Sequence, residues 1–201
     1  MQTQIGGSEA LVGNRAESLK DAEEALRLSQ LPNVKVSAAL IYGIAREEQK
    51  ALALADDIQK TRPNDTMAQN VAVPTIRALV ALMPANAAKA DPAKALDLLN
   101  SAILYARADN GVLFLRGVAY RELGRYPEAL QDFQKIIDLK SMSGPDTVIA
   151  VAQLELGRVY QRQGDAAKAR IAYQNFLTTW KDADPDLPLL KAAKAEYAKL
   201  Q

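Results

Sequence analysis

Two side chains that often perform chemistry in proteins, those of cysteine and histidine, are missing from this sequence. None of its 201 residues is a cysteine or a histidine, which excludes thiol catalysis, disulfides and the usual zinc sites. Histidine is also the most common general base in enzymes, so that role is vacant in this sequence. The sequence therefore predicts a chain that is not an enzyme, with no catalytic residue, no cofactor and no metal ligand.

Paired carboxylates and paired glycines are the remaining groups that suggest a reaction. Carboxylate pairs such as Glu23-Glu24 resemble an acid/base pair, but adjacent helical residues point about 100° apart and do not converge on one substrate atom. Gly6-Gly7 lacks the Gly-Lys-Ser/Thr that follows in a phosphate-binding loop. We interpret the carboxylates as solvated helix faces and the glycines as small residues of a first helix.

Composition and charge narrow the classes of partner. The 25 basic and 24 acidic side chains give a net charge of +1, without the basic block that is typical of nucleic-acid-binding proteins. No apolar run reaches the roughly 20 residues that a membrane helix needs, so we expect no membrane contact within this chain. The compartment stays open, because a chain without thiols suits either redox state.

The elements that must position a binding surface form an internal repeat. Two segments share one spacing of small and aromatic residues, offset by 40 positions: Gly117-x2-Tyr120-x3-Gly124-x4-Ala129-x3-Phe133 and Gly157-x2-Tyr160-x3-Gly164-x4-Ala169-x3-Tyr173. The pattern resembles the tetratricopeptide repeat family, whose units of roughly 34 residues each contain two antiparallel helices. The extra residues here coincide with 141–146, a loop by its Ser, Gly, Pro and Asp content.

The spacing also has a direct physical meaning. Gly117 and Tyr120 lie three residues apart, so they share one face of a first helix. Gly124 ends that helix, because glycine adopts a positive φ without strain. Ala129 then lies where the second helix crosses the first most closely. Each copy of the pattern therefore predicts a helix, a tight turn and a second helix.

Weaker copies extend the repeat toward the N-terminus. Arg46 occupies the turn position that glycine holds in the strong copies. Pro74 falls inside a first helix, where proline should kink the helix or delay its start. Residues 84–92 are interpreted as an insertion. The copies together predict five helix pairs, at 1–31, 32–65, 66–107, 110–144 and 146–183.

A last helix is expected at 187–200. An apolar stripe runs along it at Leu190, Ala193, Tyr197 and Leu200. Such a stripe suits a helix that caps the open side of the last pair, and Trp180 is expected to pack against it. The predicted fold is a single all-α domain over 1–201, a tetratricopeptide-type solenoid of antiparallel helix pairs in a right-handed superhelix. Helix content should exceed about 65%, roughly twice the globular average, with no β-sheet.

The family resemblance also implies a concave groove lined by fixed positions of each first helix. Carried over residue by residue, these positions are Val36, Leu40, Phe114, Val118, Arg121, Val151, Leu154, Arg158 and Arg162. The polar clamp that holds a partner's carboxylate in the best-known members is replaced here by mostly apolar residues. The three arginines predict a preference for acidic partners. Two interpretations are open: the groove binds a partner, or the cap helix or a second subunit covers it.

A narrower resemblance concerns three stretches, 9–14, 62–65 and 169–200. They are similar to the C-terminal repeat region of bacterial eukaryotic-like serine/threonine protein kinases. In that family a kinase domain comes first, often followed by a membrane segment and then by such repeats. This chain has no Gly-rich loop, HRD motif or DFG motif. The resemblance therefore implies a sensor or docking portion of such a kinase, or a stand-alone relative, and carries no catalytic residue onto this chain.

One main functional hypothesis follows from these observations. The chain is expected to be a scaffold that binds a peptide or a helix of another protein. The alternative is a structural, self-associating module whose groove is covered by its own helices, and an enzyme is the remote third. The identity of the partner and the oligomeric state do not follow from the sequence.

Overall fold

Tight turns with one shared backbone geometry connect the first and second helices of a pair. The turn residue has a positive φ in each case, at Gly13, Arg46, Gly124 and Gly164. The N–H of Gly124 donates to the Arg121 carbonyl (3.1 Å), and the next N–H donates to the Tyr120 carbonyl (2.8 Å). This pair of hydrogen bonds satisfies the last carbonyls of the first helix and starts the second helix at once. The turn at Arg46 has the same two bonds, so the predicted turn forms there without glycine.

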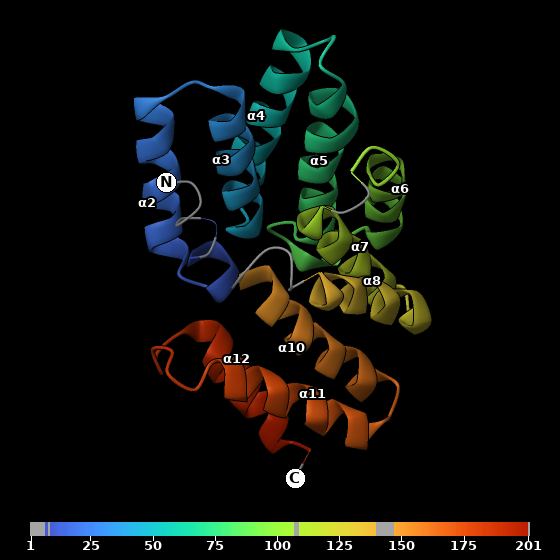
Figure 1. Ribbon diagram of the computed structural model, residues 1–201. Coiled ribbons are helices and arrows are strands. Elements are labelled where there is room, and N and C mark those ends of the chain that lie inside the picture. The colour runs from blue at the N-terminus through green and yellow to red at the C-terminus, as the bar shows by residue number, and fades with distance from the viewer. Residues whose placement is uncertain (1–6, 8, 107–108, 140–146, 201) are drawn as a thin grey trace.

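The computed structural model describes residues 7, 9–106, 109–139 and 147–200, and the predicted loop at 141–146 lies outside them. The helices that follow the repeat pattern pair in chain order: α3 (Pro32–Ile44) with α4 (Glu48–Thr61), α7 (Asn110–Glu122) with α8 (Tyr126–Asp138), and α10 (Thr147–Arg162) with α11 (Ala166–Thr179). Before them, residues 9–12 and α2 (Arg15–Leu28) flank the Gly13 turn. The chain is 78% helical, and its described part contains no strand, which confirms the predicted all-α repeat fold (Figure 1).

One pair departs from the regular pattern where the sequence contains prolines. Its first helix begins as a π-helical segment, η1 (Ala68–Ala72), and continues as α5 (Val73–Leu82). The Val73 N–H donates to the carbonyl of Ala68, five residues earlier. The wider π turn accommodates Pro74, which has no N–H to donate, and this is the irregularity that the proline predicts.

The second helix of this pair, α6 (Pro92–Ala102), follows the expected insertion. The insertion contains a short 3₁₀ turn, η2 (Ala87–Lys89). The Asp91 side chain accepts a hydrogen bond from the Lys94 N–H and caps the start of α6. The Asp91 N–H donates a hydrogen bond to the Ala81 carbonyl (2.9 Å), so the end of the insertion is held against the end of α5.

The close approach of paired helices depends on the small residues of the repeat. A Cβ atom at Gly117 would lie 2.7 Å from the Phe133 ring, and one at Gly157 would lie 3.1 Å from the Tyr173 ring. Both aromatic side chains are fully buried, as are Ala129 and Ala169. The predicted fit of a small residue against an aromatic ring is therefore present in both strong copies.

The first helices lie on the inner side of the curved stack. α3 packs against α5, α5 against α7, and α7 against α10, whereas no comparable packing joins successive second helices in the described residues (Figure 1). Helices on the inner side of a curved solenoid come closer together than those on the outer side. The first helices therefore provide the concave face. The assignment of the whole chain to one domain stays a prediction.

The last helix, α12 (Pro188–Ala198), closes the apolar end of the stack. Leu190 and Ala193 are buried against the aromatic side chains of α11, as the apolar stripe predicts. Trp180 stacks on Phe176 of α11 with ring centroids 5.1 Å apart, and it packs on the cluster to which α12 contributes Leu190 and Ala193. The start of α12 also touches the first turn, because a Cβ at Gly13 would lie 2.9 Å from the Cβ of Pro188.

Larger side chains at the helix crossings should destabilise the fold. We expect Ala129→Leu and Ala169→Leu each to lower the free energy of unfolding by about 1–3 kcal/mol, because neither fully buried site has room for three more carbons. Chemical denaturation of each variant measures the change. Gln131→Leu, at an exposed position of the same helix as Ala129, is the matched control and should have little effect. Unchanged midpoints for both alanine variants would contradict the crossing geometry.

The left-handed turn at Arg46 should respond to glycine but not to alanine. Arg46→Gly is expected to raise the free energy of unfolding by about 0.5–1 kcal/mol, because φ is +61° and glycine avoids the Cβ strain. Arg46→Ala keeps the Cβ atom and should bring no such gain. Equal thermal stability of the two variants would show that this turn is not strained.

Candidate functional site

The predicted groove residues all lie on first helices. Val36 and Leu40 are on α3, whereas Phe114, Val118 and Arg121 are on α7, and Val151, Leu154, Arg158 and Arg162 are on α10. Since α7 packs directly against α10, the helices that carry the last two sets lie side by side on the inner side of the stack. The α3 pair belongs to the same inner side, further toward the N-terminus.

Four of the apolar groove residues remain partly exposed. Val36 and Leu40 rest on the N-terminal core, and Phe114 and Val118 rest on the core around α7 and α8. The Phe114 ring is held by Phe133, with centroids 5.9 Å apart and planes inclined by 58°. Their inner sides thus support the fold, while their outer sides stay accessible on the inner face of the stack.

The two apolar residues on α10 have a different environment. Val151 is 4% exposed and Leu154 is fully buried. Leu154 belongs to a cluster with Leu190 and Ala193 of α12, which occupies the position that the first helix of a further pair would take. The apolar contact expected from Leu154 is therefore already made by the cap helix.

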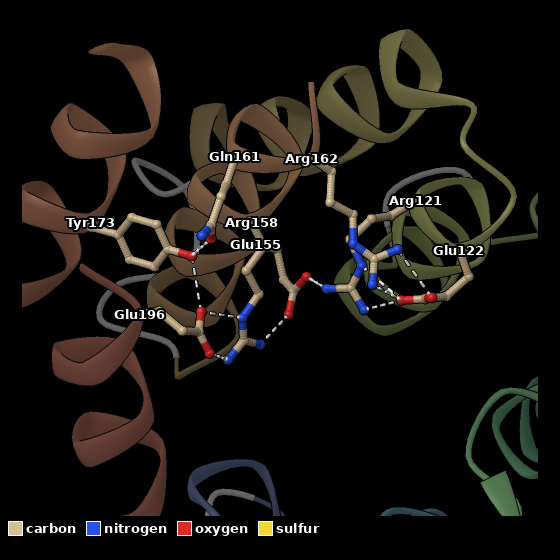
Figure 2. Close-up of polar contacts among 8 residues, drawn as sticks. All are labelled: Arg121, Glu122, Glu155, Arg158, Gln161, Arg162, Tyr173 and Glu196. Atoms are coloured by element: carbon tan, nitrogen blue, oxygen red, sulfur yellow. Dashed lines mark hydrogen bonds and ion pairs between the residues drawn. The ribbon is translucent and has the colours of Figure 1, made fainter. Parts of the chain in front are cut away.

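A row of alternating charges crosses the inner face from α7 to α12 (Figure 2). The buried Glu155 carboxylate contacts the guanidiniums of both Arg121 and Arg158, and its distance to Arg158 is 2.7 Å. Arg158 continues to Glu196 of α12 through two hydrogen bonds of 2.8 and 2.9 Å. The Tyr173 hydroxyl, from α11, donates to Glu196 at 2.9 Å. Four helices are thus connected by one chain of polar contacts.

The row continues on the other side of Arg121. Glu122 accepts from Arg121 at 2.7 Å and from both terminal nitrogens of Arg162 at 3.2 Å. Arg162 is the most exposed of the three predicted arginines, with 45% of its side chain accessible. Three guanidiniums therefore face three carboxylates, those of Glu122, Glu155 and Glu196. The predicted preference for acidic partners loses its basis, because each arginine is already paired.

The environment shifts the proton affinities of this row. Burial opposes ionisation of Glu196, but hydrogen bonds from Arg158 and Tyr173 outweigh it and lower the pKa of this carboxyl below its ordinary 4.5. Burial, together with the bond to Glu196, raises the pKa of the Tyr173 hydroxyl well above 10. Burial likewise opposes ionisation of Glu122, yet its arginine neighbours lower its pKa. Glu122 and Glu196 are therefore ionised at neutral pH, and Tyr173 stays protonated as a hydrogen-bond donor.

The acidic members of the row were missed by the sequence analysis. Glu122 and Arg162 are separated by 40 residues, which is the offset of the repeat itself, so the alignment of the two copies places them side by side. The sequence alone therefore contains the signal for this pair. Glu196 gives no such signal, because it belongs to the cap helix and not to a repeat.

The arrangement is suited to recognition and to fixing the cap helix. Among the described residues, no group of three or more acidic side chains is placed to hold a metal ion. Within the same residues, no helix is both long and apolar enough to cross a membrane. The row instead forms a charge-balanced surface beside the partly exposed apolar pair Phe114 and Val118.

Known proteins share the repeat and the fold. Residues 104–182 match the family described as tetratricopeptide repeat, which covers the last two helix pairs. A search of curated proteins finds no match. A thermophilic TPR protein of Thermus thermophilus, TTC0263, is 17% identical with a TM-score of 0.67, over 99% of this chain and 96% of that chain. MamA from Desulfovibrio magneticus RS-1 is 20% identical with a TM-score of 0.53, and the match covers 91% of this chain and 95% of that chain.

A third similar structure is a tetratricopeptide repeat protein of Parabacteroides merdae ATCC 43184. It is 16% identical with a TM-score of 0.56, over 96% of this chain and 72% of that chain. The predicted repeat is therefore confirmed for 104–182, and the three likenesses show the fold over 91% to 99% of the chain.

The ion pair between Arg158 and Glu196 should make the free energy of unfolding depend on pH in the acid range. Glu196→Gln is expected to lower the free energy of unfolding by about 1–3 kcal/mol at pH 7, because a charge-assisted pair is lost. Since the folded pKa of Glu196 is lowered, its contribution is complete above pH 4.5 and declines as the pH falls further. The gap between parent and variant should therefore narrow below that pH.

Urea titrations between pH 7 and pH 3 measure this gap. Glu17→Gln, which alters an exposed carboxylate on α2, is the control and should follow the parent closely. A gap that stays constant down to pH 3 would contradict the assigned pairing.

Proposed function

We propose that this chain is a scaffold that binds a segment of another protein along its inner face. The observation that carries the proposal is the partial exposure of Phe114 and Val118 beside the charge-balanced row. Large apolar side chains on a rigid concave surface are the usual anchors of peptide recognition. The match of 104–182 to a repeat family of binding scaffolds supports this interpretation. Within the groove, Val36 and Leu40 extend the apolar contact toward α3.

The surface chemistry suits an amphipathic helix or an extended segment with an apolar side chain. Phe114 and Val118 lie four residues apart, so one helical turn presents both to the same partner residue or to two successive ones. The ion pairs of Arg121 and Arg162 at the edge provide hydrogen-bonding groups without net charge. Binding should then depend only weakly on salt, because there is no unbalanced charge to screen.

A second candidate follows from the position of α12. This helix buries Leu154 and pairs Glu196 with Arg158, so the C-terminal end of the groove is occupied by the chain itself. The structural alternative, a module whose groove is covered by its own helices, is thus supported at that end. In the scaffold proposal the partner contacts α3 and α7 and adjoins α12.

The resemblance to kinase C-terminal repeats supports a narrower version. In it, the scaffold is the docking or sensor portion of a bacterial serine/threonine kinase, or a relative that works alone. The full length of the parent gene tests this version. A kinase domain upstream of the repeats would support it, and its absence from the gene would leave the stand-alone relative.

A charge on the inner face should abolish partner capture. We expect Val118→Asp to reduce the amount of partner recovered by at least tenfold, because a carboxylate opposes burial of the apolar anchor. Affinity capture with the purified chain, followed by mass spectrometry, identifies the partner and compares the variants. Leu28→Asp introduces the same charge at an exposed apolar position of α2 and should leave that capture intact.

Circular dichroism of both variants separates lost binding from lost folding. Full capture by a folded Val118→Asp variant would move the partner surface away from the inner face. Leu154→Asp is unsuitable for this test, since it places a charge in the core.

A further inference from the structure

A cavity of about 420 Å³ lies at the tight turns of the N-terminal half of the chain. Residues of three successive helix pairs line it, among them Arg15 of the first, Arg46 of the second and Ala85 of the third. None of the predicted groove residues of the inner face is among its lining. Small-molecule sites usually have volumes of about 300–1,000 Å³, so this space is large enough for a ligand of its own.

Two departures of this chain from the regular repeat meet at the cavity. Arg46 holds the turn position that is glycine in the strong copies, and its φ is +61°. Ala85 belongs to the insertion at 84–92, which a regular unit lacks. Positions where a sequence departs from the local rules of its fold are often functional. The repeat architecture by itself requires neither residue.

The guanidinium of Arg46 has no partner within the described part of the chain. It makes no ion pair and no hydrogen bond there, and the residue is exposed. A side chain with a Cβ atom is disfavoured in this left-handed conformation, where glycine is not. The Arg46 side chain therefore adds backbone strain and returns no polar contact to the fold. A bound anion is the interaction that it still lacks.

A second guanidinium at the cavity is held in place by the neighbouring turn. The Arg15 Nε donates to the Ala45 carbonyl at 2.8 Å, and a terminal nitrogen of Arg15 pairs with Glu47. Glu47 offsets the charge of Arg15, whereas no carboxylate offsets that of Arg46. None of the described residues that line the cavity is acidic. The lining therefore favours an anion.

The rest of the wall is mostly aliphatic, with contributions from Ile44, Ala45 and Ala85. The Ser18 hydroxyl at the cavity already donates to the Arg15 carbonyl at 2.9 Å. Peptide groups of a protein segment would lose their hydration against this wall without finding hydrogen-bond partners. A hydrocarbon chain has no such groups and gains apolar contact. The lining thus suits an anionic group on an aliphatic chain better than a peptide.

We infer that this cavity binds an aliphatic carboxylic acid in its ionised form. The carboxylate pairs with the Arg46 guanidinium, whose planar N–H groups match the two oxygens. The hydrocarbon chain lies against Ile44, Ala45 and Ala85. The inference concerns a site other than the inner face and does not rest on the scaffold proposal, so its test needs no partner protein.

Sodium hexanoate is a suitable probe for the full chain, and hexanamide is its uncharged counterpart of nearly the same shape. In a ¹⁵N-resolved NMR titration at pH 7 we expect saturable shifts of the backbone N–H groups of Ile44, Arg46 and Ala85 with hexanoate. Hexanamide should bind at least fivefold more weakly, because it offers no charge to Arg46. Added salt should weaken the binding of hexanoate, because the pair with Arg46 is accessible to solvent.

Three variants separate a binding role from a structural one. Arg46→Gly should weaken hexanoate binding at least fivefold although it raises the thermal midpoint, so unfolding cannot explain the loss. Arg46→Lys keeps the charge and should retain more of the binding than Arg46→Gly. Arg170→Gln removes one positive charge from an exposed position of α11 and should bind hexanoate as the parent does.

The opposite results would overturn the assignment. Equal binding of hexanoate and hexanamide, or parent-like binding by Arg46→Gly, would remove Arg46 as the recognition group. Shifts confined to Phe114 and Val118 would place the acid on the inner face. Inorganic phosphate binding as tightly as hexanoate would reduce the site to an anion contact without a place for the chain. Tighter binding of acetyl-Ala-Glu-Ala-amide would replace the free acid by an acidic side chain of a protein.

Discussion

The contact between a small residue and an aromatic ring within each strong helix pair is the constraint on which the rest of this structure depends. Gly117 against Phe133 and Gly157 against Tyr173 leave no room for a Cβ atom without a shift of the ring. This close approach sets the distance and angle between the two helices of a pair. Because the same contact recurs 40 residues later, the two pairs have the same close internal packing, and repeated units of this kind stack into a curved solenoid.

Curvature in turn separates two surfaces with different chemistry. The inner face places the first helices side by side and gathers charged groups from helices far apart in the chain. The outer face leaves space between second helices, where amides and aliphatic side chains remain uncharged. One helix, α10, contributes to both surfaces through its opposite sides.

The cap helix covers the open end of the helix stack. An apolar stripe covers the exposed side of α11, and Glu196 joins the charged row through Arg158 and Tyr173. Apolar burial supplies most of the attachment, whereas the ion pair fixes the register of α12 against α10. As a consequence, α12 occupies part of the inner face. Leu154 therefore belongs to the core and not to the groove.

The sequence by itself determined the helix pairs, their tight turns and the cap, because these depend on local spacing and on residues with special backbone freedom. Even the irregular first helix of the third pair was indicated by Pro74. The tertiary structure alone decided which groove residues stay accessible and which charges are compensated. Leu154 and Phe114 occupy equivalent positions in their repeats, yet only Leu154 is covered by α12. Exposure and ion pairing depend on side chains brought together from distant segments. The periodicity of a single sequence does not predict which of these side chains come into contact.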